Sequence, residues 1–124
     1  MLEVERETLE RFKKKVLNEL KNRIHAIVVY GSLAKGGYTK DSDIDILVIG
    51  EDKNDWKKVS EIAYEIDFEN CFMTFITTIF LTKDEFEYRL KAGDPFIHNV
   101  LKEGVALYDT GVYERFRKSM LEAR

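Results

Sequence analysis

The feature that most constrains this chain is the stretch at residues 28–49, VVYGSLAKGGYTKDSDIDILVI, where two apolar runs enclose a polar segment. The first run, IHAIVVY at residues 24–30, is rich in β-branched residues and ends at a glycine, which predicts a buried strand. The second run, DIDILVIG at residues 43–50, is polar at its start and apolar by its end, which also predicts a strand. The fold must therefore place a polar loop between two strands.

The segments around these two strands alternate between helical and extended patterns. Apolar residues recur at three- and four-residue steps over residues 2–22 and 54–66, which predicts two helices, the second with Asn54 as its N-cap. The run CFMTFITTIFL at residues 71–81 predicts a third strand. The aromatic residues in and before this strand are expected in the core: Phe68, Phe72, Phe75 and Phe80.

The C-terminal third carries clear boundary signals. Thr82 followed by Glu85 fits a capping box that opens a helix to about residue 91. Pro95 suits the first turn of the next helix, and Gly104 is expected to end it. A short edge strand at residues 105–109 and a helix at 112–121 complete the chain. The alternation of helices and strands predicts an α/β (α+β) domain.

Composition excludes several classes of protein. With 124 residues, 44% of them hydrophobic and 12% aromatic, the chain is expected to form one globular domain. The net charge of −3 argues against dedicated DNA binding, since nucleic-acid binders usually carry a basic excess. The charged N-terminus has no signal core, and no segment approaches the roughly 20 apolar residues of a membrane span. The single cysteine, Cys71, expected half-buried beside Phe72, favours a cytoplasmic location.

Asp43 and Asp45 are the candidate metal ligands. Side chains alternate across a strand, so these two carboxylates should project from one face about 7 Å apart, with Ile44 and Ile46 directed into the core. Two such carboxylates repel unless a positive charge lies between them. Mg²⁺ favours one or two carboxylates together with substrate phosphates. The alternative is a polar loop whose aspartates only mark a turn and a strand edge, which suits Asp41 well.

The residues before this pair are typical of a phosphate-binding turn. Gly31 allows a ligand to approach the backbone closely, and Ser32 adds a hydroxyl beside N–H groups that favour anions. Lys35 and Lys40 lie in the intervening loop, where they could screen a triphosphate or be ordinary solvated lysines.

Two other motifs do not fit this stretch. A Walker A loop requires Gly-Lys-Ser/Thr after its four-residue gap, whereas Gly36 is followed by Gly37 and Tyr38. An EF-hand beginning at Asp41 would need glycine at its sixth position and glutamate at its twelfth, and the chain has Ile46 and Asp52 there.

The run GSLAKGGYTKDSDID, which is Gly-Ser, ten residues and Asp-x-Asp, resembles the signature of the DNA polymerase β-like nucleotidyltransferases. The resemblance covers residues 24–82, and the absence of further domains is similar to the minimal nucleotidyltransferase (MNT) branch. The tail DPFIHNVLKEGVALYD also looks like the end of small MNT-like proteins. The resemblance implies one nucleotidyltransferase domain over residues 1–124, built on a small mixed sheet flanked by helices.

The resemblance also implies an activity. ATP or another NTP would lie against Gly31 and Ser32, with Mg²⁺ held by Asp43 and Asp45, which would be both the catalytic and the metal-binding residues. A nucleotidyl group, most plausibly AMP, would pass to a hydroxyl of a protein or an RNA. Many MNT proteins are antitoxins that adenylylate a HEPN partner, so a HEPN-type partner is a family expectation, and an oligomer is possible.

One departure from the family pattern concerns a third carboxylate. The family usually supplies it from the next strand, but CFMTFITTIFL has no acid, and the best register places Thr77 at the expected position. Asp67 and Glu69 precede that strand and are candidates to substitute, although both also suit a solvated helix–strand loop. The missing acid favours an alternative function, a catalytically weak nucleotide-binding or antitoxin module that acts by complex formation.

Overall fold

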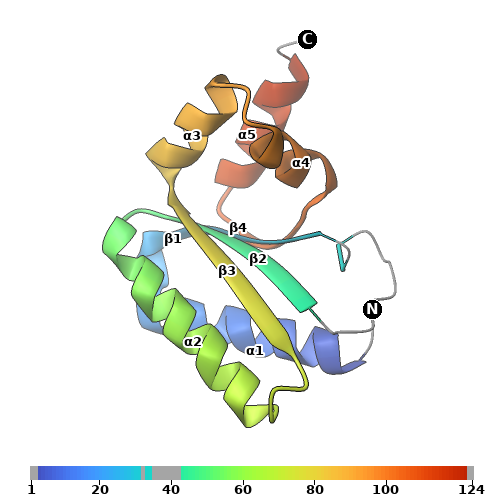
Figure 1. Cartoon of the computed structure of the whole chain (residues 1–124). Helices are drawn as coiled ribbons and strands as arrows, with labels where there is room; N and C mark the ends of the chain where they lie inside the picture. Colours follow the sequence, from blue (N-terminus) through green and yellow to red (C-terminus); the bar gives the residue numbers. More distant parts are fainter. Residues whose placement is uncertain (1–2, 32, 35–42, 123–124) are drawn as a thin grey trace.

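Helices and strands alternate along the chain in the computed structural model, which describes residues 3–31, 33–34 and 43–122 (Figure 1). The α-helices of this part are α1 (Glu3–Leu20), α2 (Trp56–Glu69), α3 (Lys83–Lys91), α4 (Pro95–Glu103) and α5 (Val112–Glu122). Two short 3₁₀ helices, η1 (Lys21–Arg23) and η2 (Lys53–Asp55), precede β1 and α2. The strands are β1 (Ile24–Tyr30), β2 (Asp43–Gly50), β3 (Phe75–Thr82) and β4 (Val105–Asp109).

The described strands form one four-stranded sheet in the order β3-β2-β1-β4. β1 pairs antiparallel with β2 and β4, whereas β2 and β3 run parallel. The parallel pair requires a crossover, which α2 supplies. The predicted fold class, a small mixed sheet flanked by helices, is confirmed.

Helices cover both faces of the sheet. α1 and α2 lie against one face, and α3, α4 and α5 gather over the other (Figure 1). Ile44 and Ile46 belong to the apolar cluster under α1 and α2, while Leu47 and Ile49 belong to the cluster under α3, α4 and α5. Because side chains alternate along a strand, Asp45 lies on the same face as Leu47 and Ile49.

The predicted boundaries of the C-terminal helices are confirmed. Thr82 and Glu85 form a reciprocal capping box at the start of α3, at 3.0 and 3.1 Å. Pro95 occupies the first turn of α4 after the Asp94 carboxylate, which accepts from the Phe96 N–H at 2.8 Å. Gly104 caps the other end of α4.

The region around α2 differs from the prediction. Asn54 is not the N-cap of this helix, because its N–H donates to the Asp52 carboxylate at 2.9 Å within η2, and α2 begins at Trp56. α2 also runs on to Glu69, so β3 starts at Phe75, four residues later than predicted. The residues between them form a turn in which Cys71 and Phe72 have left-handed φ angles of 54° and 58°.

The prediction that the phenylalanines of this region are core residues is wrong for three of the four. Phe68, Phe72 and Phe75 are 64%, 51% and 61% exposed, whereas Phe80 packs against the core under α1 and α2. Cys71 is also exposed rather than half-buried. The buried face of α2 is already filled at helical spacing by aliphatic residues: Val59, Ile62, Ala63 and Ile66.

Within the described residues, no helix combines the length and the apolar character that crossing a membrane would need.

Candidate active site

The predicted aspartate pair lies where β1 ends and β2 begins. Tyr30, the last residue of β1, is the cross-strand partner of Asp45. Asp43 is exposed and Asp45 is partly buried, so both carboxylates are within reach of solvent. The antiparallel pairing therefore brings the end of the first strand and both acids of the motif to one place, as the sequence predicted.

Gly31 cannot be replaced here without moving a carboxylate. A Cβ on this residue would lie 2.6 Å from Asp45 Oδ2, and the backbone has a left-handed φ of 78°. Both conditions favour glycine, because other residues rarely adopt this φ and because the space is occupied. The backbone of the turn thus packs directly against Asp45.

The surroundings of Asp45 disfavour its ionised form. Burial first, and the neighbouring Asp43 charge second, raise the pKa of Asp45 above its usual range. Both effects disfavour the ionised carboxylate. A divalent cation bound between the two groups would reverse both effects, and carboxylate oxygens are the ligands that Mg²⁺ prefers. The pair fits such an ion.

A pocket opens beside this turn, between the end of β1 and α4. It has a volume of about 410 Å³, within the usual range for small-molecule sites. Tyr30 and Phe96 meet edge to face in its wall, with ring centroids 5.3 Å apart. Burial, and then the charge of Asp45, raise the pKa of Tyr30, so its phenol stays protonated. The lining residues are Tyr30, Gly31, Phe96, Asn99, Val100 and Glu103.

Sequence reasoning did not connect α4 to this site. Asn99 and Glu103 lie about 70 residues beyond Gly31 along the chain and reach the pocket only because α4 packs over the end of β1. The one sequence signal was the resemblance of residues 94–109 to the end of MNT-like proteins, which carries no residue roles.

The third strand supplies no acid at the aspartate pair. β3 runs parallel to β2 with Asp45 opposite Thr77, which confirms the predicted register. Phe75 stands opposite Asp43. A threonine hydroxyl can donate or accept a hydrogen bond, but it is not a base at neutral pH.

Asp67 does not replace that acid. It lies in the last turns of α2 rather than in a solvated loop, and its two carboxylate oxygens accept from the Thr74 hydroxyl at 2.8 Å and the Ile76 N–H at 2.9 Å. Ile76 belongs to the core under α1 and α2, on the opposite face of the sheet from Asp45. Glu69 is paired with Arg11 at 2.6 Å. Both acids have structural partners elsewhere.

Three predicted nucleotide-binding residues, Ser32, Lys35 and Lys40, lie outside the described residues. Among residues 3–31, 33–34 and 43–122, no group of three or more His, Cys, Asp or Glu side chains is placed to hold a metal ion. The described acids at the turn are therefore a pair, and an ion held there would take its remaining ligands from substrate and water.

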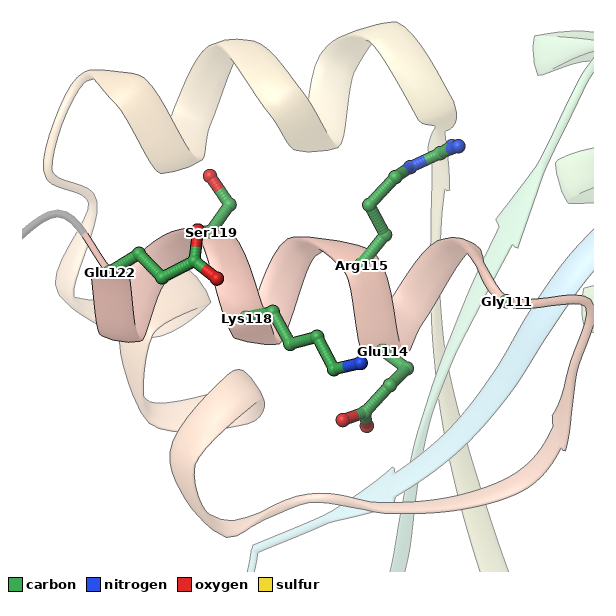
Figure 2. Close-up of a pocket in the computed structure, with 6 residues that line it drawn as sticks. All are labelled: Gly111, Glu114, Arg115, Lys118, Ser119 and Glu122. Carbon is green, nitrogen blue, oxygen red and sulfur yellow. The ribbon is translucent and has the colours of Figure 1, made fainter.

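A larger pocket lies along α5, but its side chains do not form a convergent site. It has a volume of about 730 Å³, and its lining mixes acids and bases: Gly111, Glu114, Arg115, Lys118, Ser119 and Glu122. Arg115 and Ser119 point to one side of α5, whereas Glu114 and Lys118 point to another (Figure 2). The helix start is already occupied, because Asp109 accepts from the Gly111, Tyr113 and Glu114 N–H groups. These side chains do not converge on one point.

The chain is similar to a known family of transferases. It matches the family described as polymerase beta, nucleotidyltransferase over residues 13–111. A Methanocaldococcus jannaschii protein named "Putative protein adenylyltransferase MJ0604" is 30% identical over 106 residues, which cover 84% of this chain and 98% of that protein.

Solved structures share the fold at low identity. Spectinomycin adenyltransferase AAD(9) from Enterococcus faecialis, with ATP and spectinomycin, superposes with a TM-score of 0.66 at 14% identity, over 89% of this chain and 58% of that one. A chain from the structure of a tri-AMPylated Shewanella oneidensis HEPN toxin in complex with MNT antitoxin gives a TM-score of 0.55 at 18% identity, over 94% of this chain and 85% of that one. At these identities the likeness concerns the fold.

Proposed function

This chain belongs to the polymerase β nucleotidyltransferase family, and on that premise we propose that it transfers AMP from ATP to a hydroxyl of a protein partner. The observation that carries the proposal is the turn at Gly31, whose backbone leaves no room for a Cβ against Asp45. The contact supports the proposal because it sets the Gly31 backbone against Asp45, where a glycine would also let a phosphate approach the main chain.

Asp43 and Asp45 are the residues that would hold Mg²⁺. When bound, the ion would neutralise charge developing on the transferred phosphate and on the pyrophosphate that leaves. Gly31 and Ser32 would contact the phosphates through the backbone and a hydroxyl, with Lys35 and Lys40 countering the remaining charge. Tyr30 would border the pocket beside Gly31 as a protonated phenol that can donate a hydrogen bond.

The partner we propose is a HEPN-type protein in the cytoplasm. Two likenesses support it: the archaeal relative is named as a protein adenylyltransferase, and the HEPN toxin in the Shewanella complex carries AMP groups beside its MNT antitoxin. The single cysteine of the chain, exposed and unable to form an internal disulfide, suits a reducing compartment.

A second candidate function follows from Thr77. Because this residue stands where the family usually supplies an acid, deprotonation of the acceptor hydroxyl lacks its usual base. In this reading the chain binds nucleotide and neutralises its partner by forming a complex, with little turnover.

One experiment separates the two functions. The purified chain is incubated with Mg²⁺, labelled ATP and a HEPN-type protein, and label on that protein is measured together with its activity. We expect transfer that the Asp43→Asn/Asp45→Asn variant abolishes. Neutralisation that persists in this variant without transfer would support the binding module, and absence of transfer with all four NTPs would exclude the transferase.

A further inference from the structure

The outer side of α2 carries an exposed stripe at every fourth residue. Trp56, Tyr64 and Phe68 are 54%, 63% and 64% exposed, and the exposed Ser60 stands between the first two. These four positions and Phe72, which is 51% exposed, are called the α2 stripe below. In Figure 1 the stripe belongs to the green helix at the surface of the molecule, on the opposite side of the sheet from α3, α4 and α5. The candidate active site does not use it.

Phe72, the last member of the stripe, lies in a turn with an unfavourable backbone conformation. Cys71 and Phe72 both have left-handed φ angles, a conformation that costs residues other than glycine about 1–2 kcal/mol each. The turn is fixed by main-chain bonds from the Cys71 N–H to Phe68 O at 3.0 Å and from the Phe72 N–H to Asp67 O at 2.7 Å. As a result the Phe72 ring lies edge to face against Tyr64 and Phe68, at 5.8 and 6.0 Å. The aromatic surface is therefore ordered.

The stripe contains both an exposed aromatic ring, Tyr64, and a recess at Ser60 that is lined in part by aromatic side chains. Ser60 is small, and over it a notch of about 480 Å³ opens between Trp56 and Tyr64. Tyr64, one helical turn further on, is itself 63% exposed. A Tyr64 ring from a second helix could occupy the Ser60 notch, and the reverse contact would follow from twofold symmetry.

The charges beside the stripe are segregated along α2. Lys57 and Lys58 lie in its N-terminal half together with one acid, Glu61, whereas Glu65 and Glu69 flank its C-terminal half, which has no base. If two α2 helices pack antiparallel, the basic half of each meets the acidic half of the other. The charges of these halves are then complementary, whereas a parallel pair would oppose like charges. The pairs that these acids make within the chain, such as Lys15 with Glu65 at 3.3 Å, are exposed and weak.

We propose that a second copy of this chain docks on the α2 stripe, forming a twofold dimer with antiparallel α2 helices. Each Tyr64 fills the Ser60 notch of the other copy, and each Trp56 faces the Phe68 of the other. Ridges made of residues four apart pack at a crossing angle of about −50°, the commonest class of helix pair.

The available area suits such a dimer. An aromatic side chain buries ~150–250 Å² when fully covered, so four that are each somewhat more than half exposed supply on the order of 400 Å² per copy. The flanking lysines and glutamates bring the contact toward the roughly 800 Å² per partner of a specific interface.

The first test is the mass of the isolated full chain by sedimentation equilibrium over a hundredfold range of concentration. We expect a dimer for the wild-type chain and a shift to monomer, by at least tenfold in dissociation constant, for Ser60→Arg, which fills the notch. Ser119→Arg is the matched control, since it makes the same change at another exposed helix position, and it should leave the dimer intact. Circular dichroism melts establish that both variants are folded.

The second test concerns the antiparallel arrangement. Lys57→Glu and Glu65→Lys should each weaken the dimer several-fold at low salt, and the double variant should recover it because the charges exchange places. A wild-type chain that is monomeric at every concentration would overturn the proposal. So would a Ser60→Arg chain that dimerises as tightly as Ser119→Arg, or a double charge variant that dimerises no more tightly than the single variants. Protection of the stripe only on adding a HEPN-type protein would assign it to that partner instead.

Discussion

Two aspartates at the same end of the sheet, Asp45 and Asp67, have opposite environments. Asp67 is 6% exposed and accepts hydrogen bonds on both carboxylate oxygens, from a hydroxyl and a main-chain N–H. Asp45 is less buried, yet its neighbours are a second carboxylate and a glycine backbone, and its pKa is raised. The two acids are close along the strands: Ile76, whose N–H donates to Asp67, is the partner of Ile44, and Ile44 directly precedes Asp45.

The difference shows that burial alone does not select a candidate site acid; the neighbours of the carboxylate matter as well. Asp67 is buried with a hydrogen bond to each oxygen, so it ties α2 to the start of β3 and is held away from the aspartate pair. Asp45 is placed with its charge unsatisfied, which costs stability and leaves the oxygens available to a cation. The comparison leads to four predictions, from the largest expected effect to the smallest.

Removing both charges at the site should eliminate transfer and leave the fold intact. Asp43→Asn/Asp45→Asn should lower AMP transfer by about 10³-fold or more, because metal stabilisation of the transition state is worth several kcal/mol. The measurement is incorporation of labelled AMP into the partner. A double variant with more than a tenth of wild-type transfer would show that these carboxylates are not the metal ligands.

Gly31→Ala should lose most transfer as well, because the new Cβ would lie 2.6 Å from Asp45 Oδ2 and displace it. Gly93→Ala is a matched control, since Gly93 has the same φ of 78° with nothing within 4 Å of the added Cβ. Both variants should lose about 1–2 kcal/mol in urea unfolding from the left-handed backbone, but only Gly31→Ala should impair transfer. Equal AMP transfer by the two variants would show that the contact between Gly31 and Asp45 does not matter for activity.

Asp67→Asn should destabilise the protein and spare the chemistry. Asparagine keeps one accepting oxygen and replaces the other with an NH₂ donor, so it cannot accept at both positions where the Thr74 hydroxyl and the Ile76 N–H now donate, and the lost bond costs about 1–3 kcal/mol. Urea unfolding gives the free energy, and transfer per folded molecule should remain within a few-fold of wild type. Loss of transfer in a folded Asp67→Asn variant would return this residue to the list of candidate acids.

Asp45→Asn alone should slightly stabilise the metal-free protein at neutral pH. Burial and Asp43 raise the pKa of Asp45 in the folded state, so ionisation penalises folding above that pKa and the penalty disappears as pH falls below it. The gain should be a few tenths of a kcal/mol, because solvent screens a partly exposed pair.

Melting temperatures with EDTA and with Mg²⁺ test this last prediction. The gap between Asp45→Asn and wild type should narrow toward pH 4, and Mg²⁺ should raise the melting temperature of the wild type more than that of the variant. A difference in melting temperature between the two proteins that widens at low pH would contradict the prediction.

Much of the site was predictable because it is local in sequence. The spacing of Gly31, Asp43 and Asp45 required only strand alternation and a turn, and the structure joins the three as expected. The register that sets Thr77 against Asp45 was also predictable, since β3 has one dense apolar segment. The roles of Asp67 and Glu69 were not predictable. Polar residues at these positions suit the last turn of a helix and a solvated loop equally well, and the structure extends α2 to Glu69.

By itself the sequence determined strands β1, β2 and β4, the capped helices α3 and α4, and the pair of carboxylates on one face of β2, since each depends on neighbours within a few residues. Tertiary structure decided the rest. Packing of α4 over the end of β1 created the pocket with Asn99 and Glu103, and the aliphatic residues of α2 took the core and left its aromatic residues outside. These outcomes depend on contacts between distant segments, which residue spacing along the chain does not encode.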